Sequence, residues 1–293
     1  SPVGTTEQVA EWLKAARPDL NIPSLDSSEG DIYLAYCPER ILPGKVIQEV
    51  VENDRVIGGI TAESSEQAVR FYRHAVKGEC HITNARTAEL CKLSENSFRD
   101  VNIAFANELS IISAKLGVDV YQLIALANRH PRVDILQPGT GVGGHCIAVD
   151  PWFIVDSAPE EARMIRTARE VNDHKPEWVV QQVASLVEDI DSPVIACMGL
   201  AYKPDVDDLR ESPSVEAVKS LIGMKLGRII VCEPFVDRLP EALSTIGAEY
   251  QDAVSAIEAA DVIVYLTAHS QFKGASAASL DGKRIFDACG LTR

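Results

Sequence analysis

The chain has 293 residues, of which 46% are hydrophobic and 24% charged, the composition of a folded globular protein with room for two domains. Its formal net charge of −15 argues against a nucleic acid or an anionic membrane surface as partner. No apolar run reaches membrane-spanning length and we expect no signal peptide. The seven cysteines form no C-x-x-C pair, which predicts reduced thiols in a cytoplasmic protein.

The first 75 residues alternate between helix and strand patterns. An amphipathic helix comes first, and we expect Thr5 or Thr6 to cap it. Two strand-like segments follow, DIYLAYCPER and DRVIGGI, and then a second helix. This order resembles the second half of a doubly wound domain. Because no strand and glycine-rich turn precede the first helix, we expect the chain to begin inside a domain.

A long helical pattern occupies the middle of the chain. No Gly or Pro interrupts residues 88–116, and a helix of about 29 residues would measure about 43 Å. Such a length suggests a spine between domains or a subunit interface. A second helical pattern covers residues 160–189, and we expect Pro176 to break it near Lys175.

The last hundred residues return to an alternation of strands and helices. The strand-like segments PVIACM, RIIVC, DVIVYLT and KRIFDAC are continuously apolar, and helical patterns separate the first three. Apolar strands that alternate with helices predict a parallel sheet covered on both faces.

A glycine-rich loop, PGTGVGGHCIAVDPWF, matches the G-x-G-x-x-G pattern at Gly139, Gly141 and Gly144. A dinucleotide-binding turn should follow a strand and open a helix. Here no clear strand precedes the loop and Pro151 follows closely, so we reject that interpretation. The glycines allow a ligand to approach the backbone, and we expect a flexible, ligand-contacting loop that ends in a thiol.

That thiol, Cys146, has two interpretations. Most free cysteines are small buried hydrophobes, and we expect this of Cys80, Cys91, Cys197, Cys232 and Cys289. Glycine-rich loops more often carry function, which favours Cys146 as a nucleophile, provided that nearby cations give it thiolate character. We expect no zinc site, because His145 and Cys146 lack a second pair of ligands at metal spacing.

Four motifs together resemble the UDP-sugar 6-dehydrogenases, the UDP-glucose/GDP-mannose dehydrogenase family. They are CPERILPGK (37–45), AELCKLSEN (88–96), GVGGHCIAVD (141–150) and GLAYKPDVDDLRESP (199–213). The resemblance covers essentially the whole chain. The segments ERILPG and GGHCIAVDPWF are most similar to the branch that oxidises UDP-N-acetyl-D-mannosamine, and Pro43 stands where the glucose-type enzymes carry a second acid.

The resemblance implies an α/β fold with two Rossmann-like, doubly wound domains joined by a long central helix. The N-terminal domain would be only partly present, in residues 1–80. Residues 81–190 would form a central helical domain for dimerisation and catalysis, and residues 191–293 a UDP-binding domain. We therefore expect an N-terminally truncated chain that acts as a homodimer.

The reaction implied is a four-electron oxidation of a sugar CH₂OH to a carboxylate with two NAD⁺ in succession. Cys146 matches the nucleophile that forms a thiohemiacetal and then a thioester. Lys92 and Asn96, one helical turn apart, match the groups that stabilise the developing alkoxide. Asp150 matches the carboxylate that acts with water as a base. Glu39 matches the acid that assists thioester hydrolysis, or else it forms a loop salt bridge with Arg40.

The family also suggests binding residues, although each cation among them has the alternative of an ordinary surface charge. Arg210 matches an arginine that reaches the NAD pyrophosphate. The expected substrate-binding residues are Arg40, Ile41, His130, Arg132, Gly143, Tyr202 and Lys203.

Three alternatives to this function remain open. The first is a truncated module that binds a UDP-sugar and dimerises without turnover, and the second is another UDP-sugar 6-dehydrogenase. A third, a long-helix dehydrogenase of the 6-phosphogluconate type, would need no nucleophilic thiol.

Overall fold

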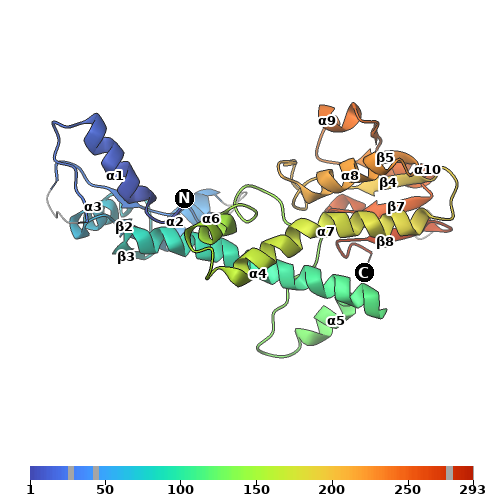
Figure 1. Ribbon diagram of the computed structural model, residues 1–293, viewed down its shortest axis with the longest axis horizontal. Coiled ribbons are helices and arrows are strands. Elements are labelled where there is room, and N and C mark those ends of the chain that lie inside the picture. Colours follow the sequence, from blue (N-terminus) through green and yellow to red (C-terminus); the bar gives the residue numbers. More distant parts are fainter. Residues whose placement is uncertain (26–29, 42–45, 275–279, 293) are drawn as a thin grey trace. The chain divides into compact units, whose positions relative to one another are not determined.

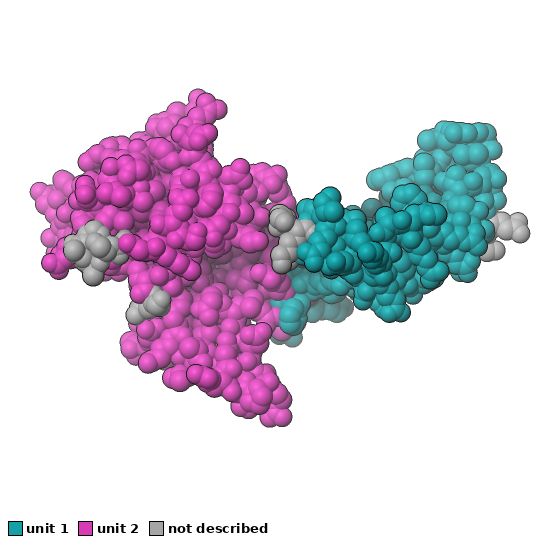
Figure 2. Space-filling view, turned by 180° about the vertical axis from the view of Figure 1, so that it is seen from behind, with its two compact units in different colours: residues 1–98, 150–163 teal, residues 99–149, 164–293 magenta. Residues whose placement is uncertain are grey.

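The computed structural model describes residues 1–25, 30–41, 46–274 and 280–292 (Figure 1). The chain folds into two compact units (Figure 2). The first comprises residues 1–98 and 150–163, and the second comprises residues 99–149 and 164–293. Pro43, at which the sequence departs from the glucose-type enzymes, lies outside the described residues.

The first unit contains a three-stranded sheet in the order β1-β2-β3. Its strands are β1 (Ala35–Tyr36), β2 (Arg55–Gly59) and β3 (Cys80–Asn84). β1 pairs antiparallel with β2, whereas β2 and β3 are parallel. The segment DIYLAYCPER therefore yields only a two-residue strand, and β3 was not expected from its mixed, mostly exposed sequence. The helices of this unit are α1 (Thr5–Ala16), α2 (Val46–Glu52), α3 (Ala62–Tyr72) and α6 (Asp150–Ser157).

Neither Thr5 nor Thr6 caps α1, so that prediction was wrong. The N-cap residue is Gly4, which makes no side-chain cap bond. Instead the buried carboxylate of Glu89 accepts the Gly4 N–H at 2.6 Å and the Thr6 N–H at 2.7 Å. An acid at a helix N-terminus satisfies free N–H groups and complements the helix dipole. The cap escaped local analysis because Glu89 lies 83 positions from Thr6.

The long helix α4 (Ala85–Leu116) has 32 residues, which confirms the predicted helix and corresponds to about 48 Å. Its residues up to Phe98 belong to the first unit and those from Arg99 to the second. Helix α5 (Val120–Ala127) follows it.

Helix α7 (Arg163–Val187) continues through Pro176, so the predicted break was wrong. Proline removes the N–H that would bind the Asn172 carbonyl, a loss of about 3 kcal/mol. Four valines beyond the proline pack into the main core of the second unit, and burial of each contributes about 1.5–3 kcal/mol. That burial outweighs the lost hydrogen bond. The four are Val179, Val180, Val183 and Val187.

The second unit contains a five-stranded, fully parallel sheet, as the apolar strands predicted. The strands are β4 (Val194–Met198), β5 (Arg228–Cys232), β6 (Glu249–Tyr250), β7 (Val262–Tyr265) and β8 (Arg284–Asp287). The remaining elements are α8 (Pro213–Met224), α9 (Glu241–Ser244), α10 (Ala253–Ala259) and the 3₁₀ turn η1 (Ser270–Phe272).

Alternate residues of these strands enter two separate hydrophobic clusters. Ile195 and Cys197 of β4 pack with α7 and α8, whereas Ala196 and Met198 pack with α10 and η1. The sheet is thus covered on both faces, which accounts for its continuously apolar strands (Figure 1).

The strand order, β6-β5-β4-β7-β8, creates a topological switch point. The chain passes from β4 through β5 to β6 and then crosses back to β7 and β8 on the other side of β4. In open α/β sheets, ligands bind beyond the carboxyl ends of the strands at such a point. No helix among the described residues is long and apolar enough to span a membrane.

Candidate active site

A tightly bonded loop, residues 199–212, connects β4 to α8 at the switch point. Gly199 has φ +92°, and a methyl group there would lie 2.7 Å from Thr267 Cβ. Ser212 donates to the Leu200 carbonyl at 2.5 Å, and it caps α8 by accepting the Ser214 N–H at 3.2 Å. Thr267 Oγ1 donates to the Ala201 carbonyl at 2.7 Å. The loop is therefore fixed by its neighbours before any ligand arrives.

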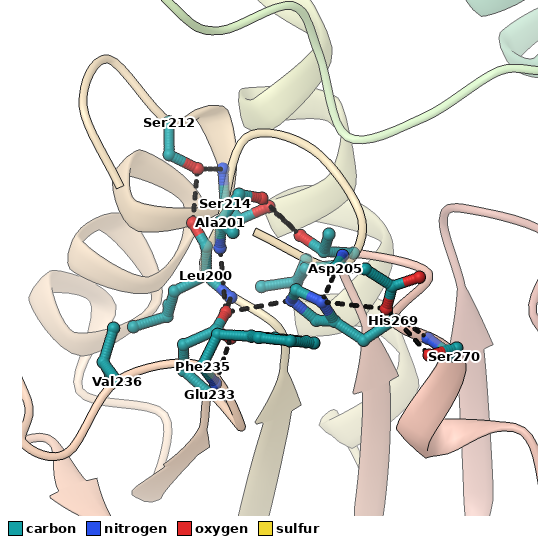
Figure 3. Close-up of polar contacts among 12 residues, drawn as sticks. Leu200, Ala201, Asp205, Ser212, Ser214, Glu233, Phe235, Val236, His269 and Ser270 are labelled. Carbon is teal, nitrogen blue, oxygen red and sulfur yellow. Dashed lines mark hydrogen bonds and ion pairs between the residues drawn. The ribbon is translucent and has the colours of Figure 1, made fainter. Parts of the chain in front are cut away.

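A buried carboxylate and imidazole hold this loop from below (Figure 3). Glu233 Oε2 accepts the N–H groups of Leu200 at 2.6 Å and Ala201 at 2.9 Å, and lies 3.0 Å from His269 Nε2. Burial alone would raise the pKa of Glu233, but these three donors together lower it below its usual value. The group is therefore a buried anion satisfied by hydrogen bonds.

The glycine-rich loop packs against the loop after β4 within the second unit. A methyl group at Gly143 would lie 2.4 Å from the Glu211 carbonyl oxygen and 2.8 Å from Tyr202 Cβ. One at Gly144 would lie 3.1 Å from the Tyr202 ring. The absence of a side chain at these two glycines allows the close contact between the two loops. Gly143 and Tyr202, two predicted binding residues, are thereby brought together.

A buried polar network anchors the other end of the glycine-rich loop. Asn107 of α4 accepts the Gly139 N–H at 2.9 Å and donates to Asn172 of α7 at 2.9 Å. Asn172 and Arg169 both donate to Asp100 Oδ1, at 2.8 and 2.6 Å. Gly141 packs against this part of α7, because a methyl group there would lie 3.3 Å from both the Asn172 carbonyl oxygen and Pro176 Cδ.

Cys146 is the exposed thiol among the seven cysteines, all of which lie within the described residues. Its carbonyl accepts the Val149 N–H in the turn that leads to α6. Burial raises the pKa of Cys197 and of Cys232 to about 12, which leaves both thiols protonated and inert. Cys37, Cys80, Cys91 and Cys289 are half-buried, so Cys80, Cys91 and Cys289 are not the fully buried side chains that we expected, and Cys146 is the most accessible of the seven thiols.

In the first unit, Asn96 and Asp150 meet. Asn96 Nδ2 donates to Asp150 Oδ2 at 2.5 Å, and the buried Asp150 begins helix α6. Lys92, one turn before Asn96, is half-buried and makes no hydrogen bond or ion pair with another described residue. An ammonium and an amide one turn apart are suited to stabilise an oxyanion.

The segment 39–41 carries three predicted site residues. Exposed Glu39 accepts the Ile41 N–H rather than pairing with Arg40. Arg40 forms its ion pair with Glu95 of α4 at 2.8 Å, so the alternative of a Glu39–Arg40 salt bridge was wrong. Glu39 is thereby left accessible at the surface.

The remaining predicted cations lie on the surface of the second unit. Exposed Arg210 forms a two-pronged contact with Asp208 at 2.8 and 2.6 Å, which lowers the pKa of Asp208 to about 2. Lys203 and Arg132 are exposed, and His130 Nδ1 accepts the Arg132 N–H at 3.3 Å. Each cation is accessible to an anionic ligand.

The described residues do not fit a complete dinucleotide site. The glycine-rich loop follows an irregular segment, and the next helix, α6, begins only at Asp150. The part of the chain that is described contains no strand, glycine-rich turn and helix of the kind that binds a pyrophosphate. The described residues also hold no cluster of three His, Cys, Asp or Glu side chains able to bind a metal.

Sequence analysis missed the residues that fix the loops. Glu89, Asp100, Asn107 and Glu233 are fully buried polar side chains. One signal was available for Glu233, which follows a continuously apolar strand directly, at the edge where α/β sheets place functional acids.

The fold and the loops are those of a two-unit α/β protein whose second unit has a parallel sheet with a topological switch point and a glycine-rich loop that leads to an exposed thiol. Family models agree. Residues 1–76, 86–174 and 196–293 match the NAD binding, central and UDP binding domains of the UDP-glucose/GDP-mannose dehydrogenase family.

The chain belongs to that family. It is 55% identical to an NDP-N-acetyl-D-galactosaminuronic acid dehydrogenase of Ralstonia nicotianae, over 99% of this chain and 68% of the relative. It is 53% identical to the UDP-N-acetyl-D-mannosamine dehydrogenase of Escherichia coli, over 100% of this chain and 71% of the relative. The structure of a UDP-D-ManNAc dehydrogenase from Pyrococcus horikoshii matches with a TM-score of 0.86 at 36% identity, over 100% of this chain and 68% of that one.

Proposed function

We propose that this chain carries out the chemistry of a UDP-N-acetyl-D-mannosamine dehydrogenase. The reaction oxidises the sugar CH₂OH by four electrons to give UDP-N-acetyl-D-mannosaminuronate, a precursor for surface polysaccharide. The observation that carries the proposal is an exposed Cys146 on a loop whose glycines pack against Tyr202 of the segment that matches the UDP binding domain. A nucleotide held by that segment would present its sugar toward a nucleophile.

In this proposal Cys146 Sγ adds to the sugar aldehyde and retains it as a thiohemiacetal, which becomes a thioester after the second oxidation. Covalent capture prevents loss of the aldehyde. Lys92 and Asn96 stabilise the negative charge on oxygen. Asp150, through a water, accepts a proton, and Glu39 assists hydrolysis of the thioester. NAD⁺ is the cofactor that the family implies, and when bound it would supply the hydride acceptor for the oxidation.

The binding residues follow the same proposal. Tyr202 and Lys203 contact the uridine and phosphates, together with Gly143. Arg210 reaches the NAD pyrophosphate. The other substrate-lining residues are Arg40, Ile41, His130 and Arg132. The division into residues 1–80, 81–190 and 191–293 and a cytoplasmic location belong to the proposal as well.

We also propose a homodimer formed through α4. Phe105, Ile112 and Leu116 are exposed by 52, 45 and 68%, and their spacing of seven and four residues is that of helices that pack along a seam. We propose that the same face of α4 in a second copy of the chain packs against these side chains. Light scattering after size exclusion should give twice the chain mass, and Ile112→Glu should give the monomer.

The deciding experiment compares several UDP-sugars as substrates. With NAD⁺ and UDP-N-acetyl-D-mannosamine we expect two NADH for each uronate formed, and a lower rate with UDP-N-acetyl-D-galactosamine, whose sugar differs at C2 and C4. Oxidation of UDP-glucose alone would identify another UDP-sugar 6-dehydrogenase. Binding of UDP without any NADH would favour a binding and dimerisation module. Full activity of Cys146→Ala would favour a dehydrogenase that needs no thiol.

A further inference from the structure

An acid stands where nucleotide-binding α/β domains recognise ribose. In dinucleotide-binding domains the acid beyond the second strand of the unit accepts hydrogen bonds from ribose hydroxyls. Glu233 directly follows β5, the second strand of this sheet in chain order, at its carboxyl edge. Yet Glu233 is 0% exposed, and both of its oxygens are already bonded to the protein.

The carboxylate of Glu233 binds the backbone instead of a ligand. Oε2 accepts the N–H groups of Leu200 and Ala201, at 2.6 and 2.9 Å, and Oε1 accepts that of Phe235 at 3.1 Å. Leu200 and Ala201 immediately precede Tyr202 in the loop after β4, within the segment that matches the UDP binding domain. A buried charge that accepts several N–H bonds holds those groups in a narrow range of positions.

His269 extends the same restraint to Asp205, in the middle of the loop. Its ring is 0% exposed, and Nδ1 accepts the Asp205 N–H at 3.0 Å, so Nε2 carries the proton that points to Glu233. The Asp205 carboxylate in turn accepts the Ser270 N–H at 2.8 Å. Figure 3 shows Glu233 and His269 side by side beneath the turn at Leu200 and Ala201.

We infer that Glu233, together with His269, is a positioning residue for the nucleotide-sugar site. At the strand end where related folds use an acid to bind ribose, this acid fixes the backbone that carries Tyr202 and Lys203. Since Tyr202 also packs against Gly143 and Gly144, the same restraint sets the loop that leads to Cys146. The inference rests on the proposed function, because it assumes that residues 202–203 contact a UDP-sugar.

The first test measures UDP binding by calorimetry for the chain and for Glu233→Gln. The amide keeps one acceptor oxygen, replaces the other with a donor and removes the negative charge, so at least one of the four N–H groups that Glu233 binds loses its acceptor and the others are held less strongly. We therefore expect the dissociation constant for UDP to rise about 10- to 100-fold. Ile257→Ala is the matched control for a loss of stability alone. Ile257 lies on α10 in the hydrophobic cluster between that helix and the sheet. The melting temperature of this variant should fall at least as much while its UDP affinity stays unchanged.

The second test separates positioning from direct contact. For both UDP and 2′-deoxy-UDP, Glu233→Gln should weaken binding by the same factor, which leaves the ratio of the two dissociation constants unchanged. If Glu233→Gln instead bound UDP and 2′-deoxy-UDP equally well, Glu233 would contact the ribose 2′-hydroxyl directly, and the inference would be overturned. Equal UDP affinity of Glu233→Gln and the original chain would also overturn it, and would leave the proposed function intact.

His269 provides a second pair of variants should Glu233→Gln fail to fold. His269→Leu removes the donor to Glu233 and the acceptor for Asp205, and should weaken UDP binding about tenfold. His269→Gln retains an amide donor toward Glu233 and should bind UDP more tightly than His269→Leu. Equal affinity of the two variants and the original chain would contradict the inference. Absence of UDP binding by the original chain would instead refute the proposed function, and this inference with it.

Discussion

The two units hold their proposed functional residues in different ways. In the first unit, Lys92 has no described hydrogen-bond partner, and Glu39 is exposed with a contact only to its own loop. In the second, the loop at Leu200 and Ala201 is held by a fully buried carboxylate. The difference is consistent with a division of labour. Lys92 and Glu39 can change partners during a reaction, whereas a binding loop gains affinity when its backbone is fixed in advance. Asp150, which is buried and accepts a hydrogen bond from Asn96, is the exception in the first unit.

The largest expected effect comes from removal of the Cys146 thiol, which should change the rate of oxidation but not the affinity for UDP. Cys146→Ala should lower the rate of complete oxidation by about 10⁴-fold or more, because the aldehyde can no longer be captured. Affinity for UDP should stay the same, since the contacts that fix the loop after β4 do not involve the sulfur. Rapid quench and product analysis would measure the rate, with Cys80→Ser as the control thiol. Normal uronate production by Cys146→Ala would refute the covalent route.

The buried network should govern stability in the second unit. Asp100→Ala leaves the guanidinium of Arg169, which is 1% exposed, without its buried partner. We expect the free energy of unfolding to fall by about 3–5 kcal/mol. The exposed pair Arg228–Glu249 offers the matched control, and Glu249→Gln should cost less than about 1 kcal/mol. Denaturant unfolding measures the free energy of unfolding of both variants. Equal decreases would show that burial does not make the Asp100–Arg169 pair more important for stability than the exposed pair.

Two glycines of the glycine-rich loop test the contact between that loop and Tyr202. Gly143→Ala places a methyl group 2.4 Å from the Glu211 carbonyl, so the loops must separate, at about 1–3 kcal/mol of stability. UDP affinity should fall as well. Gly139→Ala meets no atom within 4 Å and should change stability by less than about 0.5 kcal/mol. If both variants unfold at the same temperature, the packing of the glycine-rich loop is not what the structure indicates.

Lys175 gives an effect on stability that depends on pH. Burial lowers its pKa to about 7 from an ordinary value of 10.5, while its ammonium lies 3.8 Å from the Trp178 ring centre. Between about pH 7 and 10 the unfolded chain holds one more proton here than the folded chain. Folding stability attributable to this group therefore rises with pH, by up to about 1.4 kcal/mol per unit.

Lys175→Met should accordingly stabilise the protein most below pH 7, and its advantage should shrink as the pH rises toward 10. Chemical denaturation of both proteins at three pH values measures the difference. A difference that stays constant with pH would mean that Lys175 keeps its proton throughout this range.

Much of the fold could be predicted from the local pattern of hydrophobic and polar residues. Helix α4, strand β2 and the parallel strands β4, β5, β7 and β8 follow from periodicities that depend only on neighbouring residues. The rejection of a dinucleotide turn at Gly139 was also confirmed, because it depended on the local context of a strand and a helix. The family resemblance was confirmed by relatives 53–57% identical to the chain.

The sequence by itself determined the class of fold, the family and the unusual cysteine motif; the exposure of Cys146 came from the structure. Only the tertiary structure decided which polar groups meet. Glu89 caps a helix 83 positions away, and Thr140 binds the Leu266 carbonyl 126 positions away. Helix α7 likewise survives Pro176 because its later turns are buried. The physical reason is common to all three: the free energy of a hydrogen bond or of burial depends on the path of the whole chain, which no local pattern contains.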